Sequence, residues 1–271
     1  MSELHTELDG HQLTLTNLDK VLYPVAGVTK GEIIDYYLRI APTILPHLYD
    51  RPLTRIRFPN GVDKSSFYEK NRPSGMPGWV PTLRVLAQGG AWGGQGRDAG
   101  EPIDYVMADS PATLVYLANL ASLELHVPQW QGASAVKDAA GAIRLDDPDV
   151  APRADLIVVD LDPGPGIETP HLVRAALLVA GRLTEDHLVP WVKTSGNKGL
   201  QVYAPIVPAP VRDAWGYVRD VAADLVARHP DRFVDVVAKD QRVERILVDV
   251  NQNLAARNTV APYSLRAREQ P

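Results

Sequence analysis

Residues 156–166 read LIVVDLDPGPG, and this stretch decides the fold that we expect for the chain. Its apolar run has the length of one buried β-strand, and the Pro-Gly pair that follows indicates a turn. Side chains two residues apart on a strand point to the same side, so Asp160 and Asp162 lie on the face of Val158. The opposite face is aliphatic and is predicted to pack against the core.

Asp160 and Asp162 carry the first chemical signal. Two unpaired carboxylates side by side raise each other's pKa unless a cation compensates, and oxygen ligands at this spacing suit Mg²⁺ or Mn²⁺. Asp249 ends a second apolar strand at 245–250, and three aspartates at strand ends would suit a two-metal site for phosphoryl transfer. The competing interpretation is structural, because aspartates before Pro-Gly often cap turns and a single strand-end aspartate is often only solvated.

Residues 194–199, TSGNKG, lie between two strands predicted within 189–206. Small residues bring backbone N–H groups and the Ser195 hydroxyl close to an anion, and Lys198 adds a positive charge. The segment is not a Walker A loop, because GxxxxGK[ST] is absent and a strand follows instead of a helix. A plain β-hairpin explains the same residues.

Weaker candidates lie elsewhere. His126 stands beside Glu124 on one strand face, although a lone histidine is more often a core or surface residue than a ligand. Phe67 and Tyr68 either stack on a base or are buried in the core.

Four segments have the start signals or the periodicity of helices. Thr29 and Glu32 form a capping box before the first, and Pro42 and Pro46 are expected to kink or end it. Lys20 and Lys30 flank the preceding loop, where they either bind a phosphate or are merely solvated. The other three helices are predicted to begin at Ser110-Pro111, at Thr169-Pro170 and at residue 211.

The predicted strands dominate both ends of the chain, and no βα unit repeats at a fixed length. We therefore expect an α+β protein with a mixed or antiparallel central sheet flanked by helices. We expect a single domain over 1–271, with residues 1–10 flexible and a mobile glycine-rich loop at 88–100. Residues 51–58 alternate, which places Arg55 and Arg57 on one face of a strand.

Composition excludes several classes of protein. The 271 residues include no cysteine, which excludes disulfide scaffolds, thiol nucleophiles and thiolate metal sites and fits a reducing cytoplasm. No apolar run approaches the roughly 20 residues of a membrane span, and the first residues lack the apolar core of a secretory signal. The net charge is −5, yet bases exceed acids in 15–85 and 239–271 while acids dominate 138–186. This pattern suits cations held centrally with phosphates around them, although random scatter explains it equally well.

Nine segments of the chain, taken in order, match one family. They are LTLTNLDKVLYP, GVTKGEIIDYY, RPLTRIRFPNGVD, SFYEK, LELHVPQW, VVDLDPG, TSGNKGL, VDVNQN and VAPYSLRAR. Over nearly its whole length the chain resembles the polymerase domain of bacterial ATP-dependent DNA ligase D, in the archaeo-eukaryotic primase superfamily.

The resemblance implies a nucleotidyltransferase with a primase-like catalytic fold, which extends a 3′-hydroxyl with NTP or dNTP at short DNA gaps or breaks. Members favour manganese and often prefer ribonucleotides. The metal-binding carboxylates of the family, which would hold two Mn²⁺ or Mg²⁺ ions, fall on Asp160, Asp162 and Asp249. Its nucleotide-binding positions fall on His126, Ser195, Lys198, Arg242, Gln252 and Arg266. Its base-stacking aromatic pair falls on Phe67 and Tyr68, and its 5′-phosphate-binding lysines fall on Lys20 and Lys30.

The chain departs from the family at several points. The family usually reads SGxKGxH, but Gln201 occupies the last position, and its carboxamide cannot become cationic. We expect weaker triphosphate binding or a changed role there, without loss of the metals. Ile56 stands where many relatives carry a basic residue, and relatives continue beyond Pro271. No KxDG ligase motif is present, so we expect that the chain does not seal nicks itself.

The partners that the resemblance implies are DNA with gaps or ends, nucleoside triphosphates, a separate DNA ligase and Ku, in a cytoplasmic, nucleoid-associated protein without a membrane partner. Two other functions stay open. A DNA-end binding module would keep the 5′-phosphate pocket with marginal catalysis, and Gln201 alone favours it. A metal phosphoesterase would use the same aspartates but leaves the SGxKG segment unexplained.

Overall fold

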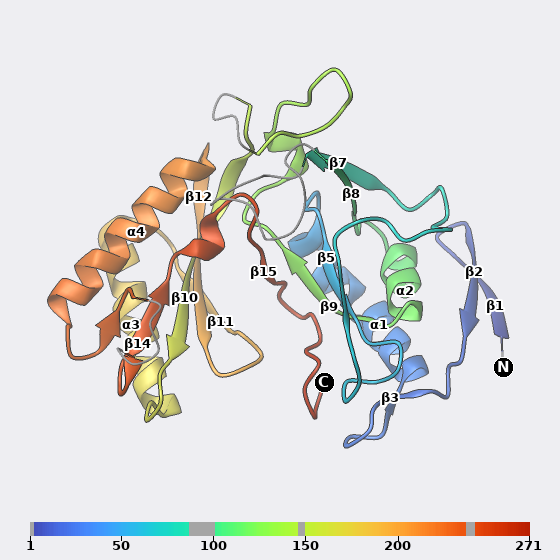
Figure 1. The fold of residues 1–271 in the computed structure, drawn as a ribbon, viewed down its shortest axis with the longest axis horizontal. Coiled ribbons are helices and arrows are strands. Elements are labelled where there is room, and N and C mark those ends of the chain that lie inside the picture. Colours follow the sequence, from blue (N-terminus) through green and yellow to red (C-terminus); the bar gives the residue numbers. More distant parts are fainter. Residues whose placement is uncertain (1–2, 87–100, 146–149, 237–241) are drawn as a thin grey trace. The chain divides into compact units, whose positions relative to one another are not determined.

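The computed structural model of the chain describes residues 3–86, 101–145, 150–236 and 242–271. The loop predicted at 88–100 lies outside these described residues. The chain packs into two compact units, whose elements are labelled in Figure 1. Unit 1 comprises Met1–Leu86, Glu101–Val127 and Thr259–Pro271, and unit 2 comprises Ala87–Gly100 and Pro128–Asn258.

Unit 2 is built on a five-stranded sheet with the order β11-β12-β10-β14-β13. Neighbouring strands are antiparallel except β13 and β14, which are parallel. The strands are β10 (Arg153–Pro163), β11 (Trp191–Thr194), β12 (Leu200–Pro210), β13 (Phe233–Val234) and β14 (Ile246–Asp249). The predicted α+β class with a mixed sheet is therefore confirmed.

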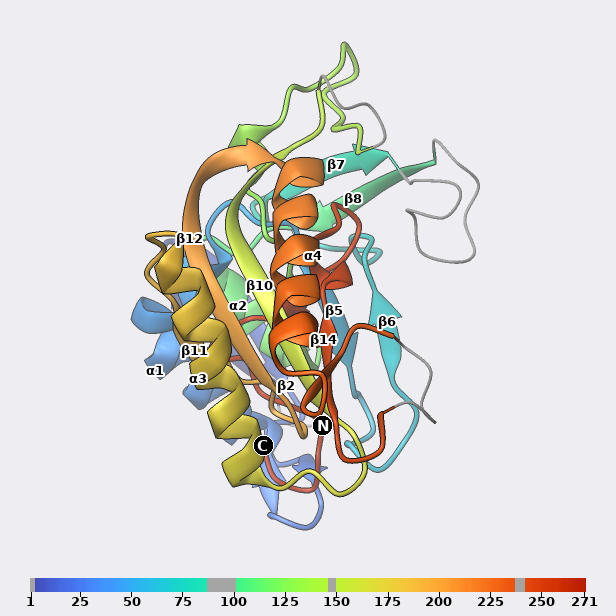
Figure 2. The same ribbon diagram turned by 90° about the vertical axis from the view of Figure 1, so that its left-hand side faces the viewer.

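Two helices, α3 (Thr169–Glu185) and α4 (Val211–Arg228), cover one face of this sheet, as Figure 2 shows. Ile157 on β10 lies beneath α4, and Val159 and Leu161, which share its face, are buried and aliphatic. The predicted aliphatic face of β10 is thus on the side that the helices cover, and Asp160 lies on the opposite face. Helix α3 begins at Thr169 as predicted, but Glu168 occupies its N-cap.

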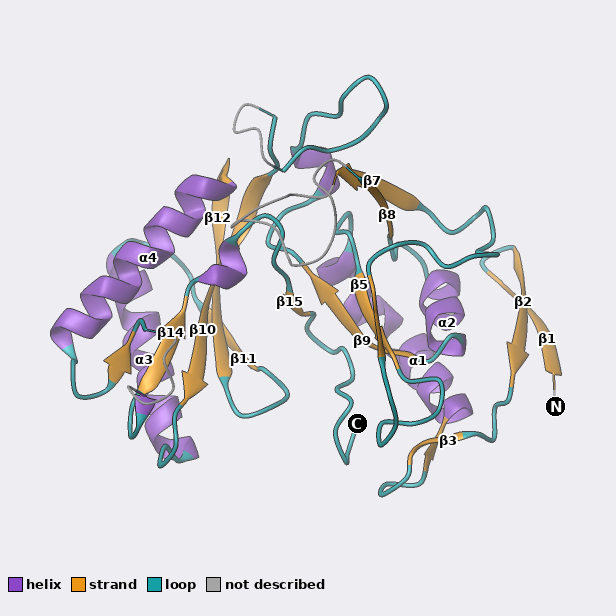
Figure 3. Ribbon diagram, viewed as in Figure 1, coloured by secondary structure: helices purple, strands orange, loops and turns teal. Residues whose placement is uncertain are grey.

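Unit 1 combines a four-stranded antiparallel sheet, ordered β15-β9-β5-β6, with two helices that pack against each other (Figure 3). These elements are β5 (Thr54–Arg57), β6 (Phe67–Glu69), β9 (Ser122–Val127), β15 (Thr259–Val260), α1 (Lys30–Leu48) and α2 (Pro111–Asn119). Three two-stranded sheets complete it, formed by β1 (Glu3–Leu8) with β2 (His11–Thr16), β3 (Val21–Tyr23) with β4 (Val28–Thr29), and β7 (Thr82–Leu86) with β8 (Pro102–Val106). Buried side chains from these elements, including Leu22, Ile44, Leu117 and Leu123, form one core.

Helix α1 begins as predicted, and of the two effects expected of its prolines, a kink or an end, the end does not occur. The Thr29 hydroxyl accepts the Glu32 N–H at 3.3 Å, and the Glu32 carboxylate accepts the Thr29 N–H at 2.8 Å. Pro42 and Pro46 lie inside the helix, which runs on to Leu48. The buried apolar stripe of α1 extends past both prolines, so its packing outweighs the hydrogen bonds that they remove.

The first ten residues, expected to be flexible, include strand β1. It pairs with β2 in regular antiparallel register, from Glu3 opposite Thr16 to Leu8 opposite His11. Asp9 and Gly10 connect the strands with positive φ angles of 53° and 77°. An Asp-Gly pair is a strong hairpin signal, because both turn positions require this left-handed backbone.

No helix in the described ranges is long and apolar enough to cross a membrane.

Candidate active site

The three predicted metal-binding aspartates lie on one face of the unit 2 sheet. Asp160 on β10 is the register partner of Asp249 on the antiparallel strand β14, and Asp162 pairs with Leu247. Residues directly opposite each other on antiparallel strands have Cβ atoms about 4.5–5.5 Å apart. Asp162 follows Asp160 by two residues and therefore shares its face.

Asp160 is a buried carboxylate in a repulsive environment. Its exposed fraction is 7%, and its Oδ1 has no hydrogen-bond partner among the described residues. Burial, followed by the charges of Asp162 and Asp249, raises the pKa of Asp160 to about 7, although Gln201 and Lys193 oppose the shift. Burial and Asp249 also raise the pKa of Asp162. Such a carboxylate pair is stabilised when a cation binds between its members.

The Asp249 carboxylate is turned toward its own loop, the 3₁₀ turn η3 (Asn251–Asn253). Its Oδ1 accepts the Asn251 N–H at 2.9 Å, and its Oδ2 accepts a hydrogen bond from Gln252 Nε2 at 3.3 Å. Within the described parts of the chain, no three His, Asp or Glu side chains are already arranged to hold a metal ion. The oxygen-only donors nevertheless fit Mg²⁺ or Mn²⁺, and the buried Asp160 Oδ1 lacks only a partner.

The TSGNKG segment forms a closed turn beside these aspartates. The Ser195 N–H donates to Gly199 O at 3.0 Å, and the Ser195 Oγ accepts the N–H groups of Asn197 and Gly199 at 3.3 and 3.1 Å. A Cβ on Gly199 would lie 2.4 Å from Leu161 O and 3.4 Å from an Asp162 carboxylate oxygen. The absence of a side chain at Gly199 therefore lets the turn pack against the end of β10, next to the carboxylates.

Lys198 is exposed on this turn. Gln252 contacts Asp249 directly, and the charge of Arg242 lowers the pKa of Asp162 against the two effects that raise it. Unit 2 thus brings together seven of the predicted site residues. They are Asp160, Asp162, Ser195, Lys198, Arg242, Asp249 and Gln252.

Unit 1 holds His126 and Arg266 against the Glu124 carboxylate. His126 Nε2 lies 2.9 Å from Glu124 Oε2, and Arg266 Nη1 lies 3.2 Å from the same oxygen. Burial raises the pKa of Glu124, but hydrogen bonds from His126 and the Ala267 N–H, together with the charge of Arg266, lower it overall. Glu124 therefore stays ionised and anchors both residues, a role that the sequence reveals only through its position beside His126.

Phe67 and Tyr68 are 52% and 59% exposed on β6, the edge strand of the unit 1 sheet. The alternative that they are buried core aromatics is therefore wrong. Arg55 and Arg57 both reach Glu69 on this strand, at 3.5 and 2.8 Å, and Arg55 is fully buried. These arginines support the edge strand from one face.

Lys20 and Lys30 lie close together at the start of α1. The Lys30 N–H donates to Lys20 O at 2.8 Å, and Lys30 Nζ donates to Thr16 O at 2.6 Å. Burial, followed by the charge of Lys20, lowers the pKa of Lys30 to about 8. A purely solvated role for Lys30 is wrong, because Lys30 is 5% exposed and its ammonium donates to Thr16 O. Positive charge beside a helix N-terminus favours the binding of an anion.

Two residues to which the sequence analysis gave no role in the site hold β14 in place. The buried Asn253 side chain accepts the Val158 N–H at 2.9 Å and donates to Val158 O at 2.7 Å, which joins η3 to β10. The Gly164 N–H donates to Arg245 O at 2.9 Å, and a Cβ there would lie 1.7 Å from Arg242 O. Asparagine and glycine near strand ends are common, so neither residue gives a specific sequence signal.

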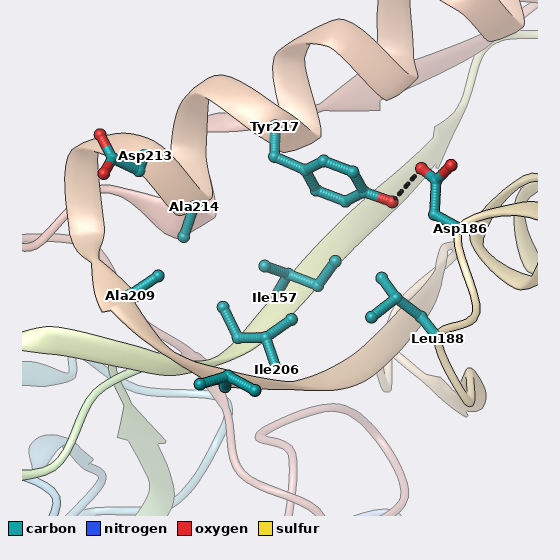
Figure 4. A pocket seen from close by; sticks show the side chains of 9 residues that line it. Ile157, Asp186, Leu188, Ile206, Ala209, Asp213, Ala214 and Tyr217 are labelled. Atoms are coloured by element: carbon teal, nitrogen blue, oxygen red, sulfur yellow. Dashed lines mark hydrogen bonds between the residues drawn. The ribbon is translucent and has the colours of Figure 1, made fainter.

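A hollow of about 260 Å³ lies under the N-terminal half of α4, on the helix-covered face of the sheet (Figure 4). Its floor is aliphatic, with Ile157 and Ile206, and Tyr217 donates to Asp186 across one side at 2.7 Å. None of the predicted site residues lines it. The predicted site residues of unit 2 therefore lie outside this hollow.

The comparisons with known proteins all point to the same family. The family model described as "LigD, primase-polymerase domain" matches residues 29–271. The multifunctional non-homologous end joining protein LigD of Mycolicibacterium smegmatis is 38% identical over 96% of this chain, and the bifunctional LigD of Bacillus subtilis is 26% identical over 95%. The chain spans 31% and 37% of these relatives.

The solved polymerase domain of Mycobacterium tuberculosis ligase D, in complex with DNA, has a similar structure. The two chains are 37% identical, with a TM-score of 0.84, and the match covers 96% of this chain and 84% of that one.

Proposed function

Because the chain belongs to the family of LigD primase-polymerase domains and is thus a nucleotidyltransferase, we propose that it extends a DNA 3′-hydroxyl with NTP or dNTP at short gaps or breaks that bear a 5′-phosphate. The observation that carries this proposal is the position of Asp160 and Asp162 beside the Ser195–Gly199 turn. Carboxylates next to an anion-binding turn are the groups that phosphoryl transfer requires. The proposed context is end joining, with the whole chain acting as one primase-polymerase domain.

The proposed metal ligands are Asp160, Asp162 and Asp249, with two Mn²⁺ or Mg²⁺ ions. When bound, such ions lower the pKa of the attacking 3′-hydroxyl and neutralise the triphosphate. Asp160 Oδ1 supports this assignment, because it is buried and has no hydrogen-bond partner in the described chain. Asp249 would exchange its hydrogen bonds to Asn251 and Gln252 for a metal.

The other predicted residues would bind the nucleotide and the DNA. In the Ser195–Gly199 turn the Ser195 oxygen accepts two N–H groups, which orients its own hydrogen outward as a donor to a phosphate. Lys198, His126 and Arg266 would stabilise the charge that develops on the leaving pyrophosphate. Arg242 and Gln252 would lie along the nucleotide, and the exposed Phe67 and Tyr68 would stack on bases.

The test is nucleotide incorporation on DNA with a short gap. We expect incorporation that requires a divalent metal and increases when the far side of the gap carries a 5′-phosphate. The assay compares NTP with dNTP and Mn²⁺ with Mg²⁺. Retained binding to 5′-phosphorylated ends without incorporation would show a DNA-end binding module instead, and release of phosphate without incorporation would show a phosphoesterase. Added DNA ligase and Ku would test the proposed partners.

Lys30→Met is expected to remove most of the preference for a 5′-phosphate. A charge-assisted hydrogen bond contributes about 1.5–3 kcal/mol, so the affinity ratio between phosphorylated and unphosphorylated ends should fall by about 10-fold or more. Because the pKa of Lys30 is about 8, the ratio of the unaltered protein should also decline as the pH rises from 7 to 9 and the ammonium loses its proton.

Fluorescence anisotropy with the two DNAs measures this ratio. Lys64→Met is the matched control, because Lys64 is an exposed lysine of the same unit that pairs with Asp63. An unchanged ratio in Lys30→Met, with DNA binding intact, would place the phosphate pocket elsewhere.

A further inference from the structure

Four side chains form a row across the unit 2 sheet. Lys193 on β11 pairs in register with Gln201 on β12, Gln201 pairs with Asp160 on β10, and Asp160 pairs with Asp249 on β14. Register partners on adjacent antiparallel strands share a face. Lys193 and Gln201 therefore continue the line of the proposed metal ligands toward the sheet edge.

The contacts within this row fix the orientation of Gln201. Lys193 Nζ donates to Gln201 Oε1 at 2.5 Å, and the Tyr203 hydroxyl donates to the same oxygen at 3.2 Å. An ammonium group can only donate, so the carbonyl end of the carboxamide must face Lys193. The NH₂ end then faces the other way, toward Asp160, the register partner of Gln201 on β10, where Gln201 lowers the pKa of the Asp160 carboxyl.

The groups that hold Gln201 have little freedom of their own. Gln201 and Tyr203 are 5% and 3% exposed. The Tyr203 ring stacks on Trp191, with centroids 4.5 Å apart and planes 9° apart, and Lys193 Nζ lies 5.7 Å from the Tyr203 ring centroid. A side chain held on two sides in this way transmits its orientation to the next group.

We propose that Lys193 is a positioning residue that acts through Gln201 to orient the Asp160 carboxylate, so that Asp160 Oδ1 stays available to a divalent cation. A direct Lys193–Asp160 ion pair would compete with the metal for that carboxylate. The intervening carboxamide instead places a neutral donor beside the carboxylate, and Oδ1 has no hydrogen-bond partner within the described residues. This inference rests on the function proposed above, because it assumes that Asp160 binds metal.

The experiment measures Mn²⁺ binding to the DNA-free protein by titration with electron paramagnetic resonance. We expect Lys193→Met to raise the Mn²⁺ dissociation constant about 10-fold, as for other residues that orient metal ligands. Lys193→Arg should restore binding to within about threefold, because a guanidinium also donates to Gln201 Oε1. Lys137→Met, at an exposed lysine of unit 2, should leave binding unchanged.

Gln201→Met and the double variant test whether the two residues act as one unit. If Lys193 acts through Gln201, the double variant should bind Mn²⁺ no more weakly than Gln201→Met alone. In gap-filling assays Lys193→Met should lower kcat, and added Mn²⁺ should restore part of the lost rate. The KM for the nucleotide should stay within about twofold of the value for the unaltered protein. Thermal unfolding identifies variants that do not fold. If Lys193→Met does not fold, the Mn²⁺ affinities of Lys193→Arg and Gln201→Met are compared instead.

Three results would overturn the inference. They are an unchanged Mn²⁺ affinity in Lys193→Met, additive losses in the double variant, and a rise in nucleotide KM alone, which would indicate direct contact with the triphosphate. If the unaltered protein binds Mn²⁺ and incorporates nucleotide while Lys193→Met behaves identically, only this inference fails. If the unaltered protein does neither, the proposed function fails as well.

Discussion

Asp160→Asn is expected to abolish nucleotide incorporation and, at the same time, to stabilise the metal-free protein. The carboxylate is proposed to hold metal, and loss of several kcal/mol of charge stabilisation lowers the rate by about 10³-fold or more. The same carboxylate is buried beside Asp162 and Asp249, so a neutral carboxamide relieves repulsion. Near neutral pH the gain in unfolding free energy should be on the order of 2 kcal/mol.

The stabilisation has a predictable pH dependence. The pKa of Asp160 is raised from 3.8 to about 7, so the folded metal-free protein binds more protons than the unfolded chain between these values. Stability contributed by this group is therefore present at low pH and is lost as the pH rises from about 4 through 7. The difference in Tm between Asp160→Asn and the unaltered protein should grow from pH 5 to pH 8.

Differential scanning fluorimetry in EDTA measures this difference, and primer extension measures the activity. Asp231→Asn is a matched control at an exposed aspartate of the same unit, and it should change neither quantity much. Surviving extension in Asp160→Asn would refute its assignment as a metal ligand. A lower Tm of Asp160→Asn than of the unaltered protein at pH 8 would show that Asp162 and Asp249 do not destabilise the Asp160 carboxylate.

Gly164→Ala is expected to cause the largest loss of stability. The added Cβ would lie 1.7 Å from Arg242 O and 2.7 Å from Arg245 O, which are backbone atoms that cannot move independently. Overpacking of a core typically costs about 1–3 kcal/mol, and this contact is closer than side-chain repacking can relieve. The displaced segment leads into β14, so the position of Asp249 and the activity should be lost as well.

Gly181→Ala is the matched control for this substitution. Gly181 lies inside α3, and its Cβ would meet nothing within 4 Å. Alanine in a helix interior is more stable than glycine by about 0.5–1 kcal/mol, so the control should stabilise the protein. Urea unfolding followed by circular dichroism measures both changes. Equal unfolding free energies for Gly164→Ala and the unaltered protein would contradict the predicted clash.

Local features of the fold were predictable from the sequence because neighbouring residues determine them. The Thr29–Glu32 capping box follows from spacing alone and is confirmed. Whether α1 ends at Pro42 and Pro46 or continues through them was not predictable in this way. It depends on packing against other elements, which local propensity does not contain.

In the candidate site, too, local spacing predicts some features, while others depend on contacts between distant strands. Asp160 and Asp162 share a face because of their spacing, whereas the pairing of Asp160 with Asp249 depends on a register between distant strands. The register also places Lys193 in the row, and no local pattern marks that lysine. Gln201 was recognised only as a departure from the family, because its contacts with Lys193 and Asp160 require three strands to be aligned.

The pairing of β9 with β15 has a consequence for how the chain can be divided. Val127, where the chain leaves unit 1, is the register partner of Thr259, where the chain returns to it. Paired residues of antiparallel strands lie about 5 Å apart, which a tight turn spans. Residues 128–258 therefore begin and end at neighbouring points. We expect that they can be deleted and replaced by a short β-hairpin turn between Val127 and Thr259, with β9 and β15 still paired.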